Sequence, residues 1–193
     1  YQYKSFEPHL INVDWRIDSA EVNMLLSQAN IKLGELNAFS QLIPEIDFFI
    51  EMHVLKEGAK SSRIEGTQTT LDEAVQKEAY IEPEKKDDWQ EVQNYVEAMN
   101  EAIQNLATLP LSNRLLKNTH KILMQGVRGT NKLPGEFRQS QNWIGGNTLT
   151  DAFFIPPHHD SIGELMSDLE KFLHNELNLV PPLIIIAIAH YQF

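Results

Sequence analysis

Apolar residues recur every three or four positions through most of this 193-residue chain, a spacing that favours amphipathic helices. One such series contains Val22, Leu25, Leu26, Ala29, Leu33 and Leu36, and a second contains Val92, Tyr95, Val96, Met99, Ile103 and Leu106. Pro110 and Gly126 are expected to end helices. The pattern predicts a mostly helical fold whose core is formed by the apolar faces of several helices.

Side chains suited to capping indicate where these helices begin. Thr70 and Glu73 have the spacing of a capping box, which predicts a helix over residues 71–80. Ser161 and Glu164 repeat that spacing and predict a helix to about residue 175. The other helices are expected to begin near Asp18 or Ser19, at Asp87 or Asp88, after Ser112 and at Pro182, and one more is expected to have Pro44 in its first turn.

Residues 126–157 differ from the rest of the chain because glycines, prolines and aromatic residues replace the helical pattern. Residues 140–144 and 153–156 are expected to pair as the two arms of a hairpin, with the glycines at 145 and 146 in the turn. The sequence therefore predicts an all-α fold with one small β-hairpin.

Composition excludes several classes of function. The net charge is −11, and phosphate backbones require clustered Lys and Arg, so nucleic acid is not an expected partner. The absence of cysteine excludes disulfides and agrees with a reducing compartment. The longest apolar run, residues 183–189, is shorter than the roughly 20 residues that a membrane span needs. We expect a cytoplasmic protein with no membrane partner. We also expect the chain to be a fragment or a processed chain, because it begins at Tyr1 and ends within an apolar helical pattern.

Five short motifs follow one another between residues 61 and 193. They read S-S-R-I-E-G at 61–66, L-P-G-E-F-R at 133–138, Q-N-W-I-G-G at 141–146, I-P-P at 155–157 and A-H-Y-Q-F at 189–193. In this order the sequence resembles the Fic (Fido) family. The resemblance implies a Fic-type helical bundle, with an N-terminal helical region at residues 1–80 and the first part of the Fic core at residues 81–193.

The resemblance also implies a reaction. Fic enzymes transfer AMP from ATP, with Mg²⁺, onto Ser, Thr or Tyr hydroxyls of a protein substrate. Their catalytic motif, H-P-F-x-x-G-N-G-R, would begin just after Phe193 and does not occur in this sequence. No catalytic residue is therefore expected within these 193 residues, which alone should be inactive.

Glu65, Ser61 and Gly66 match the inhibitory pattern [S/T]-x-x-x-E-[G/N] of one Fic class. By this resemblance Glu65 would pair with the arginine of the catalytic motif and take the place of the ATP γ-phosphate, while Ser61 would anchor the inhibitory helix of residues 61–66. Taken without the resemblance, Glu65 is a solvated carboxylate at a helix end, and Gly66 only ends that helix.

The predicted hairpin corresponds by resemblance to the family's flap, at about residues 139–157, which aligns the target by strand addition. The flap residues expected to contact the target are Ile144, Gly145, Gly146, Phe153, Phe154 and Ile155. The same residues could instead be ordinary edge packing. Arg138 is expected to hold this segment in place and to have no catalytic role.

No metal site is expected. His158 and His159 are adjacent, so their rings should point in different directions, and no third ligand has the spacing of a zinc site. The sequence also has no G-x-x-x-x-G-K-[ST] loop, which excludes a P-loop nucleotide site.

Two other functions stay open. A Fic-fold enzyme could remove AMP or use another nucleotide donor, with Glu65 then orienting a water. The protein could also be a non-enzymatic interaction module that binds a partner through the apolar helix faces of residues 25–36 and 92–106. A homodimer is a further possibility that the sequence does not decide.

Overall fold

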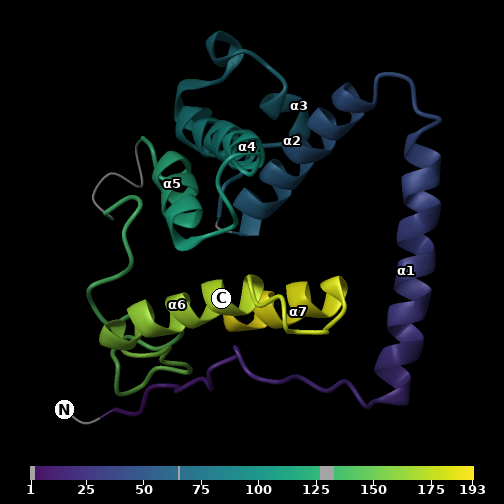
Figure 1. Cartoon of the computed structure of the whole chain (residues 1–193). Coiled ribbons are helices and arrows are strands. Elements are labelled where there is room, and N and C mark those ends of the chain that lie inside the picture. Colours follow the sequence, from purple (N-terminus) through teal and green to yellow (C-terminus); the bar gives the residue numbers. More distant parts are fainter. Residues whose placement is uncertain (1–2, 65, 127–132) are drawn as a thin grey trace. The chain divides into compact units, whose positions relative to one another are not determined.

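The computed structural model describes residues 3–64, 66–126 and 133–193 (Figure 1). Its helices are α1 (Ala20–Ser40), α2 (Ile46–Ile64), α3 (Leu71–Ala74), α4 (Lys86–Asn105), α5 (Asn113–Leu123), α6 (Ile162–Leu173) and α7 (Pro182–Gln192). Short 3-10 turns are η1 (Glu78–Tyr80), η2 (Pro83–Lys85) and η3 (His159–Ser161). Because the described ranges contain helices and no sheet, the predicted all-α class is confirmed.

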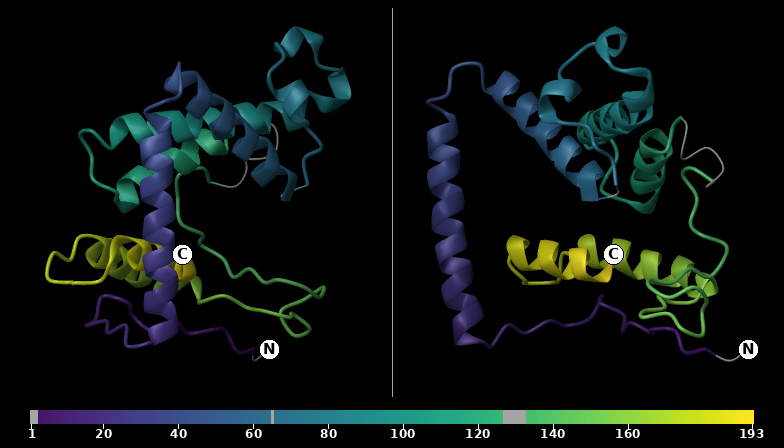
Figure 2. Two further views of the ribbon diagram at one scale, coloured as in Figure 1. Left: turned by 90° about the vertical axis from the view of Figure 1, so that its right-hand side faces the viewer. Right: turned by 180° about the vertical axis from the view of Figure 1, so that it is seen from behind.

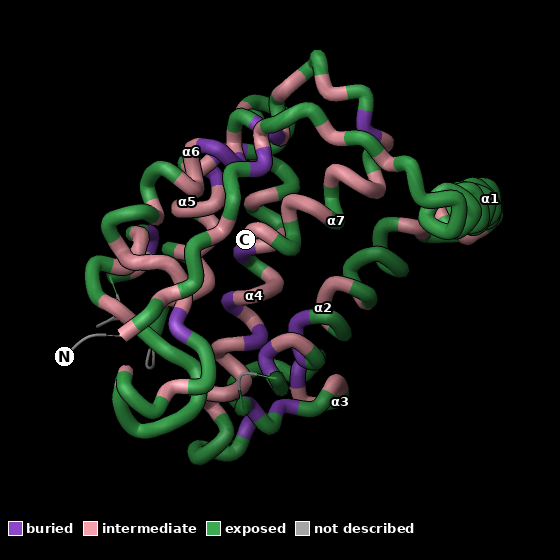
Figure 3. The backbone as a smooth tube through the Cα atoms, turned by 90° about the horizontal axis from the view of Figure 1, so that it is seen from below, coloured by how far each residue is buried: buried purple, intermediate pink, exposed green. Residues whose placement is uncertain are grey.

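The chain divides into two compact units. One unit is Gln28–Glu136, and the other combines Tyr1–Ser27 with Phe137–Phe193. Helix α1 crosses the boundary between them and has no buried residue, as its exposed colouring in Figure 3 shows. The division into residues 1–80 and 81–193 that the sequence suggested stays a prediction.

In the unit Gln28–Glu136, helices α2, α3 and α4 meet around a small core of Ala59, Ala74 and Val92. Val92 is completely buried, and Leu55 packs against the same cluster. Helix α5 packs against α4, where Asn94 donates to the carbonyl of Gln125 at 2.5 Å. The buried positions on α2 and α4 appear in purple in Figure 3. This packing fixes the C-terminal half of α2 against α4.

The helix predicted over residues 71–80 is shorter than expected. Thr70 and Glu73 form the predicted capping box, but α3 ends at Ala74, and the 3-10 turn η1 follows separately. The carbonyl of Ala74 accepts the side-chain amide of Gln93 from α4 at 2.9 Å. In a continuous helix that carbonyl would accept a backbone amide four residues on, so this tertiary hydrogen bond favours the break.

The other unit is organised by α6, whose Leu169 and Phe172 form a core with Ile11 of the N-terminal arm. Helix α7 contributes Ile185 and Ile188 to the same cluster. Within this unit the arm runs along α6 and α7 in both views of Figure 2. In the part of the chain that the structure describes, no helix is both long and apolar enough to cross a membrane.

Helix α6 begins differently from the prediction. Ser161 makes no side-chain capping bond, and its backbone is already helical because the 3-10 turn η3 leads directly into α6. The acceptor at the start of this turn is the Nδ1 atom of His158, 3.4 Å from the amide of Asp160. The predicted capping box at Ser161 and Glu164 is therefore wrong, since the helical turn starts earlier.

The predicted hairpin is reduced to one antiparallel bridge between Ile144 and Phe154. The amide of Ile144 donates to Phe154 at 2.8 Å, and the amide of Phe154 donates back at 3.1 Å. Pairing cannot continue along the second arm in the usual way because Pro156 and Pro157 have no amide hydrogen. The carbonyl of Ile155 instead accepts the amide of Phe6 at 2.8 Å.

Candidate functional site

The C-terminus of α2 carries the first group of candidate residues. Gly66 has a φ of +103°, its amide donates to the carbonyl of Arg63 at 3.2 Å, and the amide of Thr67 donates to that of Ser62 at 3.1 Å. These two bonds form a Schellman motif, in which a left-handed glycine closes the helix. The expectation that Gly66 ends this helix is confirmed, and the closed turn fixes where the chain leaves α2.

Of the predicted inhibitory residues, Glu65 lies outside the described residues, so its role stays a prediction. Ser61 is half-buried, and its hydroxyl donates to Glu57 one turn earlier in α2 at 3.0 Å. This bond joins two residues of the same helix. Ser61 can therefore stabilise α2 locally, while the attachment of α2 to its neighbours depends on other residues.

Close packing between α2 and α4 provides that attachment. A Cβ atom at Gly58 would lie 2.9 Å from Cδ1 of Tyr95, so only a glycine lets the two helices approach this closely. Ala59 and Ser62, on the same side of α2, are buried. No role was predicted for Gly58 and Ala59 from the sequence, although the run of small residues G-A-K-S-S at 58–62 indicates close helix packing.

The segment after α2 is tied to the start of α4. The amide of Gln68 donates to the Asp88 carboxylate at 2.7 Å, and Lys85 forms a 2.8 Å ion pair with Glu73. The hydrogen bond from Lys85, together with those from the backbone and hydroxyl of Thr70, lowers the pKa of Glu73 to about 2. The capping carboxylate is therefore ionised at neutral pH, as its role as an acceptor requires.

The flap turn is organised by Asp151. Its carboxylate accepts the amide of Asn147 at 3.0 Å and the amide of Thr148 at 2.7 Å. The Thr148 hydroxyl donates to the same carboxylate at 2.5 Å. These bonds, led by that from Asn147, lower the pKa of Asp151 to about 2. The carboxylate thus holds the turn that joins the two sides of the bridge.

Two glycines let the chain turn tightly beside Asp151. Gly145 and Gly146 have φ values of +71° and +70°. A Cβ atom at Gly146 would lie only 2.4 Å from the carbonyl oxygen of Asp151, a distance that no side chain could occupy. These two predicted flap residues are therefore required by the geometry of the turn itself.

The other predicted flap residues separate into exposed and buried positions. Phe153 is 90% exposed and Ile144 is 63% exposed, whereas Ile155 is buried. Phe154 lies between these extremes, and its ring contacts that of Phe6 with centroids 5.9 Å apart. The structure places the six residues within one local segment and presents Ile144 and Phe153 to solvent.

Arg138 joins the two ends of this segment. Its guanidinium donates to the carbonyl of Ser140 at 3.1 Å and to the carbonyl of Pro157. Burial lowers the pKa of Arg138 from its ordinary value. Hydrogen bonds to two backbone carbonyls agree with the structural role expected for this residue.

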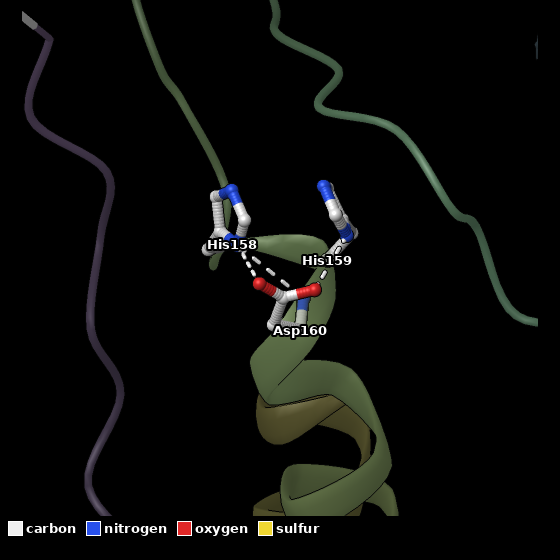
Figure 4. Close-up of side chains that lie close together, drawn as sticks. All are labelled: His158, His159 and Asp160. Atoms are coloured by element: carbon white, nitrogen blue, oxygen red, sulfur yellow. Dashed lines mark hydrogen bonds and ion pairs between the residues drawn. The ribbon is translucent and has the colours of Figure 1, made fainter.

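His158, His159 and Asp160 form a side-chain cluster directly after the flap (Figure 4). The two imidazole rings lie side by side, with centroids 4.1 Å apart and an angle of 34° between their planes. Both Nδ1 atoms approach the Asp160 carboxylate, His158 at 3.3 Å and His159 at 3.0 Å. The expectation that the adjacent rings point in different directions is wrong, because the chain bends into η3 between Pro157 and Asp160.

Two family models match the chain. The Fic/DOC family N-terminal model matches residues 23–104, and the Fic/DOC family model matches residues 110–193. The C-terminal turn of α2 lies in the first match, and the flap segment with the His158 cluster lies in the second. Together the matches account for all but residues 1–22 and 105–109.

Proposed function

The chain belongs to the Fic/DOC family, and on this premise we propose that it serves protein AMP transfer from ATP onto Ser, Thr or Tyr hydroxyls. The observation that carries the proposal is the pair of family matches, which together extend from residue 23 to residue 193 apart from a five-residue interval. ATP and Mg²⁺ are assigned to the complete enzyme. The residues present include neither the P-loop pattern nor H-P-F-x-x-G-N-G-R, so they provide no phosphate cradle.

Within that enzyme we assign autoinhibition to the end of α2. Glu65 stands between Ile64, the last residue of α2, and Gly66, whose left-handed conformation closes the helix. The packing of Gly58 on Tyr95 supports a regulatory role, because it fixes α2, which ends one residue before Glu65 in the sequence, relative to α4. By the family resemblance, the Glu65 carboxylate would take the position of the ATP γ-phosphate and so exclude ATP.

The flap is proposed to align the protein target. Ile144 and Phe153 are exposed beside the bridge and can contact an added strand. Ile155 is buried and its carbonyl is bonded to Phe6, so it is better suited to anchoring the flap than to target contact. Of the six flap residues, this assignment keeps the exposed Ile144 and Phe153 as the residues that contact the target.

The test replaces Glu65 in a protein in which these residues are joined to the family's catalytic motif. Glu65→Gly and Glu65→Gln should both raise incorporation of labelled AMP, about 10-fold or more, because each removes the carboxylate that competes with the γ-phosphate. Asp72→Asn is the matched control, since it removes an exposed carboxylate from the same unit. AMP transfer equal to wild type in both Glu65 variants would reject the inhibitory role.

The same variants separate the rival functions. If the enzyme removes AMP, the Glu65 variants should lose hydrolysis of AMP-modified protein and gain no transfer. A non-enzymatic interaction module is favoured by one observation, an open groove of about 370 Å³ between α2 and α4 with Phe49, Ile50 and Met99 in its lining. Such a module should show no ATP binding, so ATP titration of the Glu65→Gly protein distinguishes it from both enzymes.

A further inference from the structure

We propose that His158, His159 and Asp160 bind a divalent transition-metal ion of the Zn²⁺ class. The three side chains each offer one donor atom, and these atoms all lie within 4.8 Å of one another. In Figure 4 the Asp160 carboxylate lies beneath the two imidazole rings, and each of its oxygens approaches a different histidine. This site is independent of the AMP-transfer proposal.

The distances suit a small metal ion. Zinc binds imidazole nitrogen and carboxylate oxygen at about 2.0–2.2 Å, so neighbouring donors around a tetrahedral ion lie roughly 3.3 Å apart. Nδ1 of His158 lies 3.3 Å from one Asp160 oxygen, and Nδ1 of His159 lies 3.0 Å from the other, so an ion would bind through either oxygen or bridge both. The donor atoms of the three residues lie within 4.8 Å of one another, so they would move closer around one ion, and if His158 binds through Nδ1 its 3.4 Å contact with the Asp160 amide is given up.

The kinds of donor select the class of ion. Two imidazoles and one carboxylate suit Zn²⁺, Ni²⁺ and Cu²⁺. Mg²⁺ and Ca²⁺ prefer six or more oxygen ligands, and only Asp160 offers carboxylate oxygens in this cluster. Three protein ligands leave one tetrahedral position for a water molecule.

The backbone holds the three residues in place before any ion binds. Pro156 and Pro157 restrict the chain on one side, and the amide of Ser161 donates to the carbonyl of His158 at 3.0 Å on the other. Arg138 also donates to the carbonyl of Pro157. The backbone that carries these ligands is therefore restrained before binding, which reduces the part of the entropic cost that comes from the main chain.

Solvent can reach the cluster. The side chains of His158, His159 and Asp160 are 42%, 29% and 80% exposed. An ion can therefore enter without unfolding α6, and the site lies where the flap segment joins that helix. Bound metal would fix the base of the flap by joining residues on both sides of the start of η3.

Isothermal titration of the purified, tag-free protein with ZnCl₂ tests the proposal. Wild type should bind one Zn²⁺ saturably, and His158→Gln/His159→Gln should bind at least about 100-fold more weakly. The matched control is His9→Gln/His53→Gln, which removes two exposed histidines elsewhere and should bind as wild type does. Equal affinity of the wild type and the His158/His159 double variant, or no saturable binding by wild type, would overturn the proposal.

A second measurement guards against variants that misfold. His159→Gln leaves the contact of His158 with the amide of Asp160 in place, so it should preserve the start of α6. In NMR spectra of the wild type, substoichiometric Ni²⁺ should broaden the imidazole resonances of His158 and His159 before those of the other histidines. Uniform broadening of all histidines would reject the site, whatever the variants show.

Discussion

The carboxylate of Asp168 accepts the amide of Ile11 at 2.6 Å, joining α6 to the N-terminal arm across more than 150 residues of sequence. The amide of Asn12 donates to the same oxygen at 3.2 Å. Asp168 and Ile11 are both buried, and Ile11 belongs to the core that α6 forms with Phe172. One carboxylate therefore fixes the path of the arm over this core.

Replacing Asp168 should destabilise the unit that contains α6. Asp168→Asn replaces a charged acceptor with a neutral amide, whose oxygen accepts the two backbone amides more weakly. We expect a loss of about 1–3 kcal/mol in the free energy of unfolding, measured by chemical denaturation. Glu176→Gln, an exposed change in the same unit, should alter it by less than about 0.5 kcal/mol. Equal stabilities of the two variants would contradict the anchoring role.

Much of the helical framework could be predicted because its signals are local. Ser112 was expected to cap a helix, and its hydroxyl accepts the amide of Leu115 at 3.4 Å. Ser19 likewise accepts the amide of Val22, and Thr70 forms its capping box with Glu73. Each of these predictions depends on residues within one turn, so the sequence contains the information.

Some of the errors arise where distant residues decide the local structure. Helix α3 stops at Ala74 because Gln93, 19 positions later, bonds to its carbonyl. The bridge at Ile144 does not extend into a hairpin, because Pro156, the next residue that would bond across the ladder, has no amide hydrogen. Gln93 lies outside residues 71–80, so no local pattern there contains it, whereas Pro156 was already visible within residues 139–157. The proximity of Gly58 to Tyr95 was missed because Tyr95, like Gln93, is distant in the sequence from its partner.

The capping box of α3 should make stability depend on pH in the acid range. The folded-state pKa of Glu73 is about 2, below its ordinary value of 4.5, because Lys85 and Thr70 favour the ionised form. The stabilisation is therefore complete above about pH 4.5 and is lost as pH falls through 2. The stability difference between wild type and Glu73→Gln, followed by urea unfolding, should be constant near neutral pH and shrink below pH 4.5.

Glu84→Gln provides the comparison for that titration. Glu84 is exposed in η2 and lies outside the capping box. The difference in free energy of unfolding between wild type and Glu84→Gln should stay small across the same pH range. A pH dependence as large as that of Glu73→Gln would show that the effect comes from general surface charge.

Replacing two glycines by alanine, one just after α2 and one inside α1, should change the free energy of unfolding in opposite directions. Gly66 has a φ of +103°, so Gly66→Ala should cost about 1–2 kcal/mol although no atom lies within 4 Å of the added Cβ. Gly34 lies inside α1, where Gly34→Ala also meets open space and should stabilise the helix by about 0.5–1 kcal/mol. Denaturant unfolding of both variants measures the two changes in the free energy of unfolding. If both changes have the same sign, backbone conformation does not decide the effect of the added methyl group.

The flap turn should be sensitive to a single methyl group at Gly146. An added Cβ would lie 2.4 Å from the Asp151 carbonyl oxygen, so Gly146→Ala must displace the turn and weaken the bridge. We expect amide exchange at Ile144 and Phe154 to accelerate about 10-fold or more, as measured by hydrogen–deuterium exchange NMR. Gly163→Ala, in α6 with open space around its Cβ, should leave both rates unchanged. Unchanged exchange in Gly146→Ala would show that the bridge does not depend on the turn, and flap alignment by Asp151 would then have to be abandoned.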